Sequence, residues 1–289
     1  MGSGIKSGFR RVWDRGVHIL TSPWRAFRAL CYVTGFFVIA STFAGTGWAL
    51  WFYHSLPKIE RKSFADFRRE AQTALSRRLP KGERMGEWVP IDRVNRDLIY
   101  AVVMAEDGQF FEHDGIDLDA MLDAFARNIR KRKVVAGGST LSQQVTKNVY
   151  LTNERSTTRK LKELILTWKI EKKFTKNQIL EVYLNIAELG PGLYGVAEAT
   201  KYYFGKAPSK MNAAEGAWLA ILLPSPRKYH YIMFQNRNIT PDKKSKMKRI
   251  LQDMAHNDYI SAEQYSRYRR WSPLKHLRRY NGRGVAGSR

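Results

Sequence analysis

The chain has 289 residues, of which 44% are hydrophobic, so it can bury one substantial core but hardly two large ones. Its formal net charge of +24 predicts an acidic partner: nucleic acid, an anionic membrane or a phosphate-bearing substrate. The single cysteine, Cys31, excludes an intrachain disulfide and a cysteine-based zinc site.

The first predicted element is a membrane anchor at 29–53. This stretch has no charged residue, and a helix rising about 1.5 Å per residue would exceed the roughly 30 Å hydrocarbon core of a bilayer. Trp48, Trp51 and Tyr53 gather at its C-terminal end, and basic residues precede it, which predicts a cytoplasmic tail at 1–28. The rest of the chain would then lie in the periplasm, where nucleic acid is a poor partner.

Two other interpretations of this stretch stay open. A cleaved signal peptide would use the small residues Ala40, Ala44 and Gly45, although its apolar core usually runs only about 7–15 residues. A buried core helix is disfavoured by the length of the stretch and by its lack of a polar face. We expect a single-pass protein of the inner membrane.

The remainder divides into three predicted parts. Segment 54–87 is charged and broken by Pro80, Gly82 and Gly86, which predicts a connecting stalk. A compact domain is predicted at 88–240, and a basic extension at 241–289 would suit an anionic membrane surface or form a solvated tail.

Helix signals dominate the domain, which predicts a mainly α fold. Asp117 is placed to cap a helix whose apolar residues recur at three-and-four spacing, and another helix should cover 161–168. Thr175 and Gln178 form a capping-box pair before the apolar run 179–186. Asn212 and Glu215 open a further helix, which Pro224 stops.

The first cluster of chemistry-bearing residues follows the apolar helix 98–105. Glu106 comes at the end of this buried element, where partial desolvation would raise its pKa toward that of a useful general base. The alternative for Glu106 is an exposed carboxylate paired with a nearby cation. For His113 the alternative is a hydrogen-bonded structural histidine.

The second cluster lies at 137–148. A glycine pair runs into hydroxyls and into the adjacent amides Gln143 and Gln144, which resembles a loop that offers donors to an oxygen-rich ligand at a helix N-terminus. Lys147 adds a positive charge one turn later. The alternative is a capped helix with polar surface amides.

The third cluster, at 155–163, places Glu163 in a basic run. Arg155, Arg159 and Lys160 are suited to a diphosphate leaving group, which gains charge as its bond breaks. A solvated ion pair between Arg159 and Glu163 is the alternative. The fourth cluster, 176–185, is apolar nearly all round and predicts a core helix.

The order and spacing of these clusters resemble the peptidoglycan glycosyltransferases of glycosyltransferase family 51, specifically the monofunctional transglycosylases. The resemblance covers roughly residues 90–230. Its motifs fall on Glu106, Asp107, Phe110, His113 and Gly115; on Gly137, Ser139, Thr140, Gln143 and Gln144; on Arg159, Lys160 and Glu163; on Ile179, Leu180, Tyr183, Leu184 and Asn185; and on the segment Gly195 to Lys206.

The resemblance implies a lysozyme-like, mainly α glycosyltransferase domain that polymerises lipid II into β-1,4-linked glycan with inversion. Glu106 would act as general base and Glu163 would assist near the donor's phosphates. No cofactor is expected to be required, although a divalent cation (Mg²⁺ or Mn²⁺) would be able to assist near the donor's phosphates. The other partners implied are the nascent glycan, anionic lipids and proteins of cell division or elongation. The substrate-binding residues would be Asp107, Phe110, His113, Ser139, Thr140, Gln143, Gln144, Lys147, Asn148, Arg155, Arg159, Lys160, Tyr183 and Asn185.

One departure from the family pattern concerns Asp123, where many members carry a basic residue. Arg127 or Arg130, one or two turns on, would substitute for it. The spacing from Ser245 to Lys248 matches a penicillin-binding nucleophile motif, but no partner motifs follow, so no transpeptidase domain is expected.

Two other functional classes remain open from the sequence. A lysozyme-like hydrolase acting on finished glycan would not need the cations at 155–160. A non-enzymatic membrane scaffold would leave its carboxylates solvated.

Overall fold

The computed structural model describes residues 23–79, 86–131, 137–152, 154 and 156–279. These residues are mainly helical, as predicted, and they fall into two compact units, Met1–Pro57 and Lys58–Arg289. The second unit contains η1 (Ile59–Arg61), α3 (Phe64–Ser76), η2 (Ile91–Arg93), α4 (Arg96–Glu106), α5 (Leu118–Lys131), α6 (Leu141–Tyr150), α7 (Thr157–Lys173), α8 (Lys176–Ile186), β1 (Glu188–Gly190), β2 (Leu193–Tyr194), α9 (Val196–Phe204), η3 (Pro208–Lys210), α10 (Ala213–Ala220), α11 (Pro226–Tyr229), the π-helix η4 (His230–Gln235), α12 (Pro241–His256), α13 (Ala262–Tyr268) and α14 (Pro273–His276).

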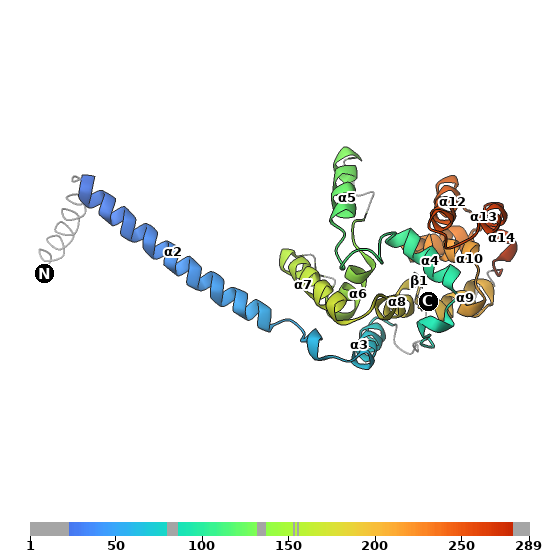
Figure 1. Cartoon of the computed structure of the whole chain (residues 1–289), viewed down its shortest axis with the longest axis horizontal. Helices are drawn as coiled ribbons and strands as arrows, with labels where there is room; N and C mark the ends of the chain where they lie inside the picture. Colours follow the sequence, from blue (N-terminus) through green and yellow to red (C-terminus); the bar gives the residue numbers. More distant parts are fainter. Residues whose placement is uncertain (1–22, 80–85, 132–136, 153, 155, 280–289) are drawn as a thin grey trace, which may run out of the picture. The chain divides into compact units, whose positions relative to one another are not determined.

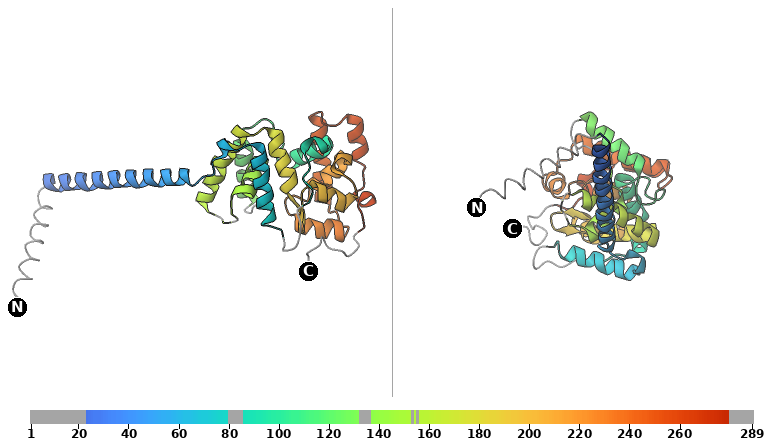
Figure 2. Two further views of the ribbon diagram at one scale, coloured as in Figure 1. Left: turned by 90° about the horizontal axis from the view of Figure 1, so that it is seen from below. Right: turned by 90° about the vertical axis from the view of Figure 1, so that its left-hand side faces the viewer.

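Helix α2 (Pro23–His54) is the described part of the first unit, and Figure 2 shows it as one unbroken helix. It contains the whole of the predicted span 29–53. Its large apolar side chains are exposed, and Phe52 is its one buried residue among those described. Within the described ranges, this is the single helix long and apolar enough to cross a membrane. Exposure on all sides is expected where a helix meets lipid and argues against a core helix.

Helix α8 forms the centre of the second unit, and every residue from Ile179 to Ile186 is buried. The predicted capping box starts it, because the Thr175 side chain accepts from the backbone N–H of Gln178 and the Gln178 side chain accepts from the N–H of Thr175. Helices α3, α6, α7 and α9 pack around it (Figure 1). The prediction of a core helix at 176–185 is therefore confirmed.

A second layer of the core joins α4 to α10 and α12. The approach of α4 to α10 is close at Gly216, where an added Cβ would lie 3.0 Å from the Cβ of Ala101 and from the Cα of Leu98. The predicted N-cap Asn212 starts α10, with Glu215 completing a capping box. The short strands β1 and β2 pair antiparallel, with Glu188 opposite Tyr194, beside α9.

Two segments predicted to lie outside the domain pack into the second unit. In the predicted stalk 54–87, α3 places Phe67 and Leu75 in the core, and Phe67 stacks on Phe174 with ring centroids 4.5 Å apart. In the predicted extension 241–289, α12 buries Met247, Ile250, Leu251 and Met254 against α4 and α10. Both segments are rich in charge, and the sequence interpretation gave that charge more weight than their helical apolar spacing.

Helix α5 exposes three large apolar residues to solvent. The predicted cap is confirmed, since the Asp117 carboxylate accepts from the backbone N–H of Ala120 at 2.7 Å. Leu118, Leu122 and Ile129 are more than half exposed. Figure 1 shows α5 standing out from the helices near it. An amphipathic helix with an uncovered apolar face marks a surface suited to an apolar partner.

A buried hydrogen-bonded chain links β1, α9 and the π-helix. Gln235 Nε2 donates to His230 Nε2 at 3.2 Å, so the ring carries its proton on Nδ1 and donates to the Tyr203 hydroxyl at 2.8 Å. That hydroxyl donates to the Leu189 carbonyl at 2.9 Å. Burial lowers the pKa of His230 from 6.5 to about 4.

We expect this histidine to make folding sensitive to acid. The unfolded chain takes up a proton at His230 below pH 6.5, whereas the folded chain resists protonation down to about pH 4, so stability contributed by the neutral ring is lost as the pH falls between these values. Thermal unfolding from pH 7.5 to 4.5 should show a falling Tm. His230→Asn, which cannot titrate, should flatten that slope, and an unchanged slope would contradict the assignment.

Candidate active site

A cavity of ≈ 300 Å³ opens where α4 ends, and it gathers residues from two of the predicted clusters. Glu106 and Asp107 come from the end of α4, and Ser139 and Thr140 come from the turn before α6. Helix α5 supplies Arg127 to the lining. The structure therefore brings the first and second clusters together, as a shared site requires.

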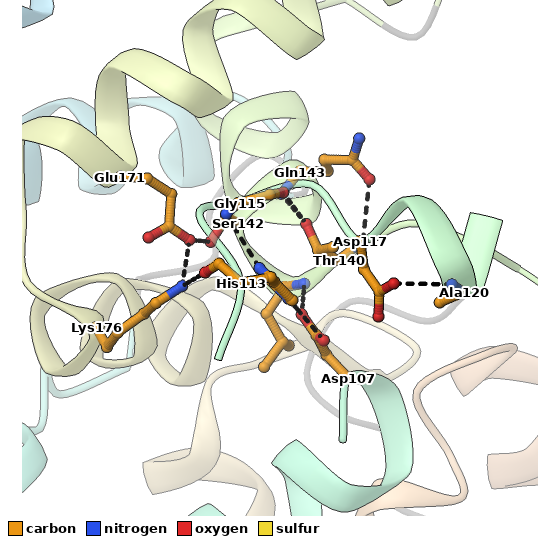
Figure 3. Close-up of polar contacts among 11 residues, drawn as sticks. Asp107, His113, Gly115, Asp117, Ala120, Thr140, Ser142, Gln143, Glu171 and Lys176 are labelled. Carbon is orange, nitrogen blue, oxygen red and sulfur yellow. Dashed lines mark hydrogen bonds and ion pairs between the residues drawn. The ribbon is translucent and has the colours of Figure 1, made fainter. Parts of the chain in front are cut away.

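The buried carboxylate of Asp107 joins these segments (Figure 3). It accepts a hydrogen bond from His113 Nε2 at 2.9 Å and another from the backbone N–H of Leu141, the first residue of α6, at 2.8 Å. The Gly115 N–H donates to His113 Nδ1 at 3.0 Å, which leaves the ring proton on Nε2. His113 thus holds Asp107 in place, which matches its structural interpretation.

A second set of contacts holds the loop after α4 against the N-termini of α6 and α8 (Figure 3). Thr140 Oγ1 donates to the Gly115 carbonyl at 2.6 Å, and Lys176 donates to the His113 carbonyl and to Glu171. Gly115 has a φ of +89°, and a Cβ there would come within 2.6 Å of the Glu171 side chain. Only glycine satisfies both conditions without strain.

Glu106 has an environment suited to a general base. It is partly buried at the end of α4, and Gln144 Nε2 donates to its Oε2 at 3.1 Å. Burial is the largest influence and raises the pKa of Glu106 above 4.5, and the charge of Asp107 raises it further. The hydrogen bond from Gln144 and the charge of Lys246 lower the pKa without cancelling the rise. Glu106 is not exposed, and it makes no salt bridge with another described residue, so the exposed ion pair considered from the sequence is not seen in this part of the chain.

Lys246 is a site residue that the sequence interpretation missed. It lies on α12, in the segment predicted to be an extension, and its charge acts on Glu106. Burial lowers the pKa of Lys246, while the charge of Glu106 opposes that change. The apolar spacing of Met247, Ile250, Leu251 and Met254 could have predicted a packed helix here, but no sequence signal joins Lys246 to Glu106.

Tyr183 and Phe110 lie near this site but are buried in the core. Burial, and then the charges of Glu106 and Asp107, raise the pKa of Tyr183 well above its ordinary value, so its hydroxyl stays protonated. Phe110 is fully buried, and Lys176 Nζ lies 4.5 Å from its ring centroid. Phe110 therefore packs under the His113 loop, and its predicted contact with substrate stays a prediction.

Gln143 and Asn185 also make structural hydrogen bonds, and their predicted contacts with substrate stay a prediction. Gln143 is fully buried, and its Oε1 accepts from the N–H of Thr140 in the capping box of α6. Both N–H groups of the Asn185 amide donate at 2.8 Å, to the carbonyls of Val89 and Glu181, and its Oδ1 accepts from the Val89 N–H. The amide of Asn185 therefore fixes the segment before α4 to α8.

The third cluster forms a buried ion-pair group on α7. Glu163 is buried, and its carboxylate accepts from Arg159 Nη1 at 2.7 Å and from Lys160 Nζ at 2.5 Å. No direct contact joins Glu163 to Glu106 among the described residues, and Glu163 is absent from the described lining of the cavity. Helix α6 links the two regions, since Gln144 contacts Glu106 and Thr146 accepts from Thr167 of α7 at 3.0 Å.

Of the remaining predicted site residues, some lie on the surface, one lines the cavity and one lies outside the described part of the chain. Lys147 is exposed on α6, three residues after Gln144 and thus on a neighbouring face. The Asn148 carbonyl accepts from Arg78. Arg155 lies outside the described residues. Asp123 is exposed, and Arg127, named as a substitute for the missing basic residue, lines the cavity.

A metal centre built from protein ligands alone is not found in the described part of the chain. No group of three or more His, Cys, Asp and Glu side chains there could hold a metal ion.

Several known proteins are similar to this chain. The transglycosylase family model matches residues 72–255. The biosynthetic peptidoglycan transglycosylase of Aromatoleum aromaticum is 41% identical over 71% of this chain and 86% of its own length, and that of Bordetella avium is 44% identical over 56% and 69%. Penicillin-binding protein 1A from Haemophilus influenzae matches 49% of this chain and 17% of its own, with 23% identity and a TM-score of 0.29.

Gly115→Ala tests whether the pinned loop depends on its backbone conformation. The positive φ and the contact with Glu171 should destabilise the fold by about 1–3 kcal/mol and lower the Tm. Gly108→Ala is the control, because the nearest atom to its added Cβ, from Met104, is 4.0 Å away. Equal Tm values for the two variants in a thermal melt would show that the loop is not constrained in this way.

Proposed function

The chain belongs to the transglycosylase family, and from that premise we propose that it is a peptidoglycan glycosyltransferase that polymerises lipid II with inversion. The observation that carries the proposal is the environment of Glu106. It is a partly buried carboxylate with a raised pKa, and it lies at a cavity lined by hydroxyls. The Gln144 amide donates a hydrogen bond to it, and the charge of Lys246 acts on it. Such a group can accept a proton from an alcohol.

The reaction is one displacement. The 4-hydroxyl oxygen of an acceptor N-acetylglucosamine attacks the anomeric carbon of the donor N-acetylmuramic acid, and its proton goes to Glu106. The bond from that carbon to the diphosphate breaks, and the electron pair leaves with undecaprenyl diphosphate. Because attack comes from the face opposite the leaving group, the product is a β-1,4 link. A diphosphate is already a good leaving group, so no protonating carboxylic acid is needed, unlike in glycoside hydrolysis.

Cations stabilise the charge that builds on the departing diphosphate. Arg159 and Lys160 are suited to this role because Glu163 holds both, and Lys147, Arg127 and Arg155 add positive charge. Glu163 then acts by positioning these two side chains, since its own carboxylate is already paired with them. A divalent cation that takes part in the reaction would bind through the diphosphate oxygens.

Two apolar features, helix α2 and the exposed side of α5, support a proposal for the location. We propose that α2 anchors the protein in the inner membrane with its basic N-terminus in the cytoplasm and its second unit in the periplasm. The exposed apolar face of α5, with Leu118, Leu122 and Ile129, would meet the bilayer, and Arg130 would meet anionic headgroups. This arrangement would bring the cavity, which α5 helps to line, near a lipid-linked substrate.

Glu106→Gln should abolish polymerisation, because an amide cannot accept the proton. We expect the rate of lengthening of labelled lipid II to fall by about 10²–10⁴-fold, while the affinity for lipid II changes little. Glu263→Gln, an exposed change on α13, should leave the rate as it is. Turnover by Glu106→Gln would refute the proposed base, and shortening of finished glycan by the native protein would indicate a hydrolase.

Lys246→Met should move the acidic limb of the pH–rate profile to higher pH. The base must be ionised, and removing the charge that lowers the pKa of Glu106 raises that pKa further. The measurement is kcat/KM for lipid II against pH. Lys201→Met, an exposed change on α9, is the matched control. A lower rate with an unmoved acidic limb would show that Lys246 acts only through packing.

A further inference from the structure

A second cavity is lined by residues of α12, α13 and the start of α14, and it shares no described lining residue with the cavity at Glu106. Its volume is ≈ 270 Å³. The floor is apolar: Met247, Leu251 and Pro273 line it and are buried. The nine-residue lining contains no acidic side chain among the described residues.

Three cations surround this floor. Lys244 and Lys248 come from one face of α12, and Arg269 follows α13; all three are exposed. None of them makes an ion pair within the described residues. The C-terminal segment 280–289 contains no Asp or Glu that could neutralise them. Unpaired cations around one cavity favour an anionic ligand.

Two aromatic rings complete the wall. Tyr268 and Trp271 are partly exposed, and the Trp271 ring stacks on His276 with centroids 5.1 Å apart. An aromatic ring beside an apolar floor suits the flat apolar face of a sugar, whereas the cations suit carboxylates. A cavity with few charged groups around an apolar interior is typical of a binding site for an organic molecule.

We propose that this cavity, formed by α12 and the α13–α14 connection, binds peptide-bearing glycan through the carboxylates of its peptides. The proposal rests on the proposed function, because the reaction would produce such a polymer beside the protein. Its occupant combines sugar rings with acidic peptide ends, the two features that the cavity matches. A flat layer of lipid headgroups fits less well, because the apolar floor is recessed and Met247 and Leu251 are buried.

Binding at this cavity would hold the product on the protein after each addition. The second cavity and the candidate active site lie on opposite sides of α12. The charge of Lys246 acts on Glu106, whereas Lys244 and Lys248, two residues before and after it, lie on the other side of the helix and line the second cavity. A glycan attached there would stay tethered while its growing end is released from the cavity at Glu106. Tethering raises the effective concentration of that end for the next cycle.

The test measures binding without turnover, using the full chain with Glu106→Gln in neutral-lipid nanodiscs. The probe is soluble peptidoglycan fragments that retain their peptides, titrated at fixed salt. Adding Lys248→Glu and Arg269→Glu should weaken binding by about tenfold or more. Adding Arg93→Glu and Lys201→Glu, two exposed changes outside the cavity, alters the net charge equally and should leave affinity within about twofold.

Three further measurements distinguish glycan binding at the cavity from misfolding and from lipid binding. Lys248→Gln and Arg269→Gln, with unchanged Tm, should also weaken binding, which excludes misfolding. Peptide-free glycan of equal length should bind the parent protein several-fold more weakly. The third measurement is the binding of the same variants to phosphatidylglycerol vesicles. The proposal would be overturned if the cavity pair and the control pair lost glycan affinity equally, or if both glycans bound with equal affinity. It would also be overturned if the cavity pair lost affinity for the vesicles alone. Lengthening of lipid II by the native chain is measured in parallel, so failure of the proposed function is seen separately.

Discussion

The geometry of the candidate active site depends on the hydrogen bonds of the buried Asp107 carboxylate. A buried carboxylate is stable only when its oxygens are hydrogen-bonded, and here one partner is His113 and the other is the first N–H of α6. These two bonds close the loop after α4 onto the N-terminus of α6. Gln144, one turn into α6, is thereby brought to Glu106. The two adjacent acids therefore have different surroundings: Asp107 is hydrogen-bonded to the start of α6, whereas Glu106 lines the cavity with a hydrogen bond from Gln144.

The pKa of Glu106 reflects a balance between opposing influences. Burial and Asp107 favour the protonated form, whereas Gln144 and Lys246 favour the carboxylate. Burial alone would favour the protonated form more strongly, whereas Gln144 and Lys246 alone would favour the carboxylate and make it a weaker base. The proposed reaction needs both influences, because its base must be ionised when substrate arrives and must still be basic enough to take the proton.

Local signals predicted much of the fold, and the motifs predicted the site's first two clusters. The caps at Thr175 and Asn212 and the apolar run 179–186 depend on residues close in sequence, so spacing alone reveals them. Burial depends on distant partners, which spacing does not contain. Phe110 and Asn185 belong to the predicted motifs, yet their contacts with Lys176 and with Val89 and Glu181 make them structural. Lys246 was missed for the same reason.

The packing of α12 shows why charge was a poor guide to the domain's boundary. A helix turns once every 3.6 residues, so alternate lysines along α12 face different ways: Lys246 lies on the side toward Glu106, and Lys244 and Lys248 lie on the other. Met247, Ile250, Leu251 and Met254 between them fill the core beside α4 and α10. The α12 segment is therefore part of the folded domain. Its unfolding would expose the core, remove the charge of Lys246 from the surroundings of Glu106 and eliminate the second cavity.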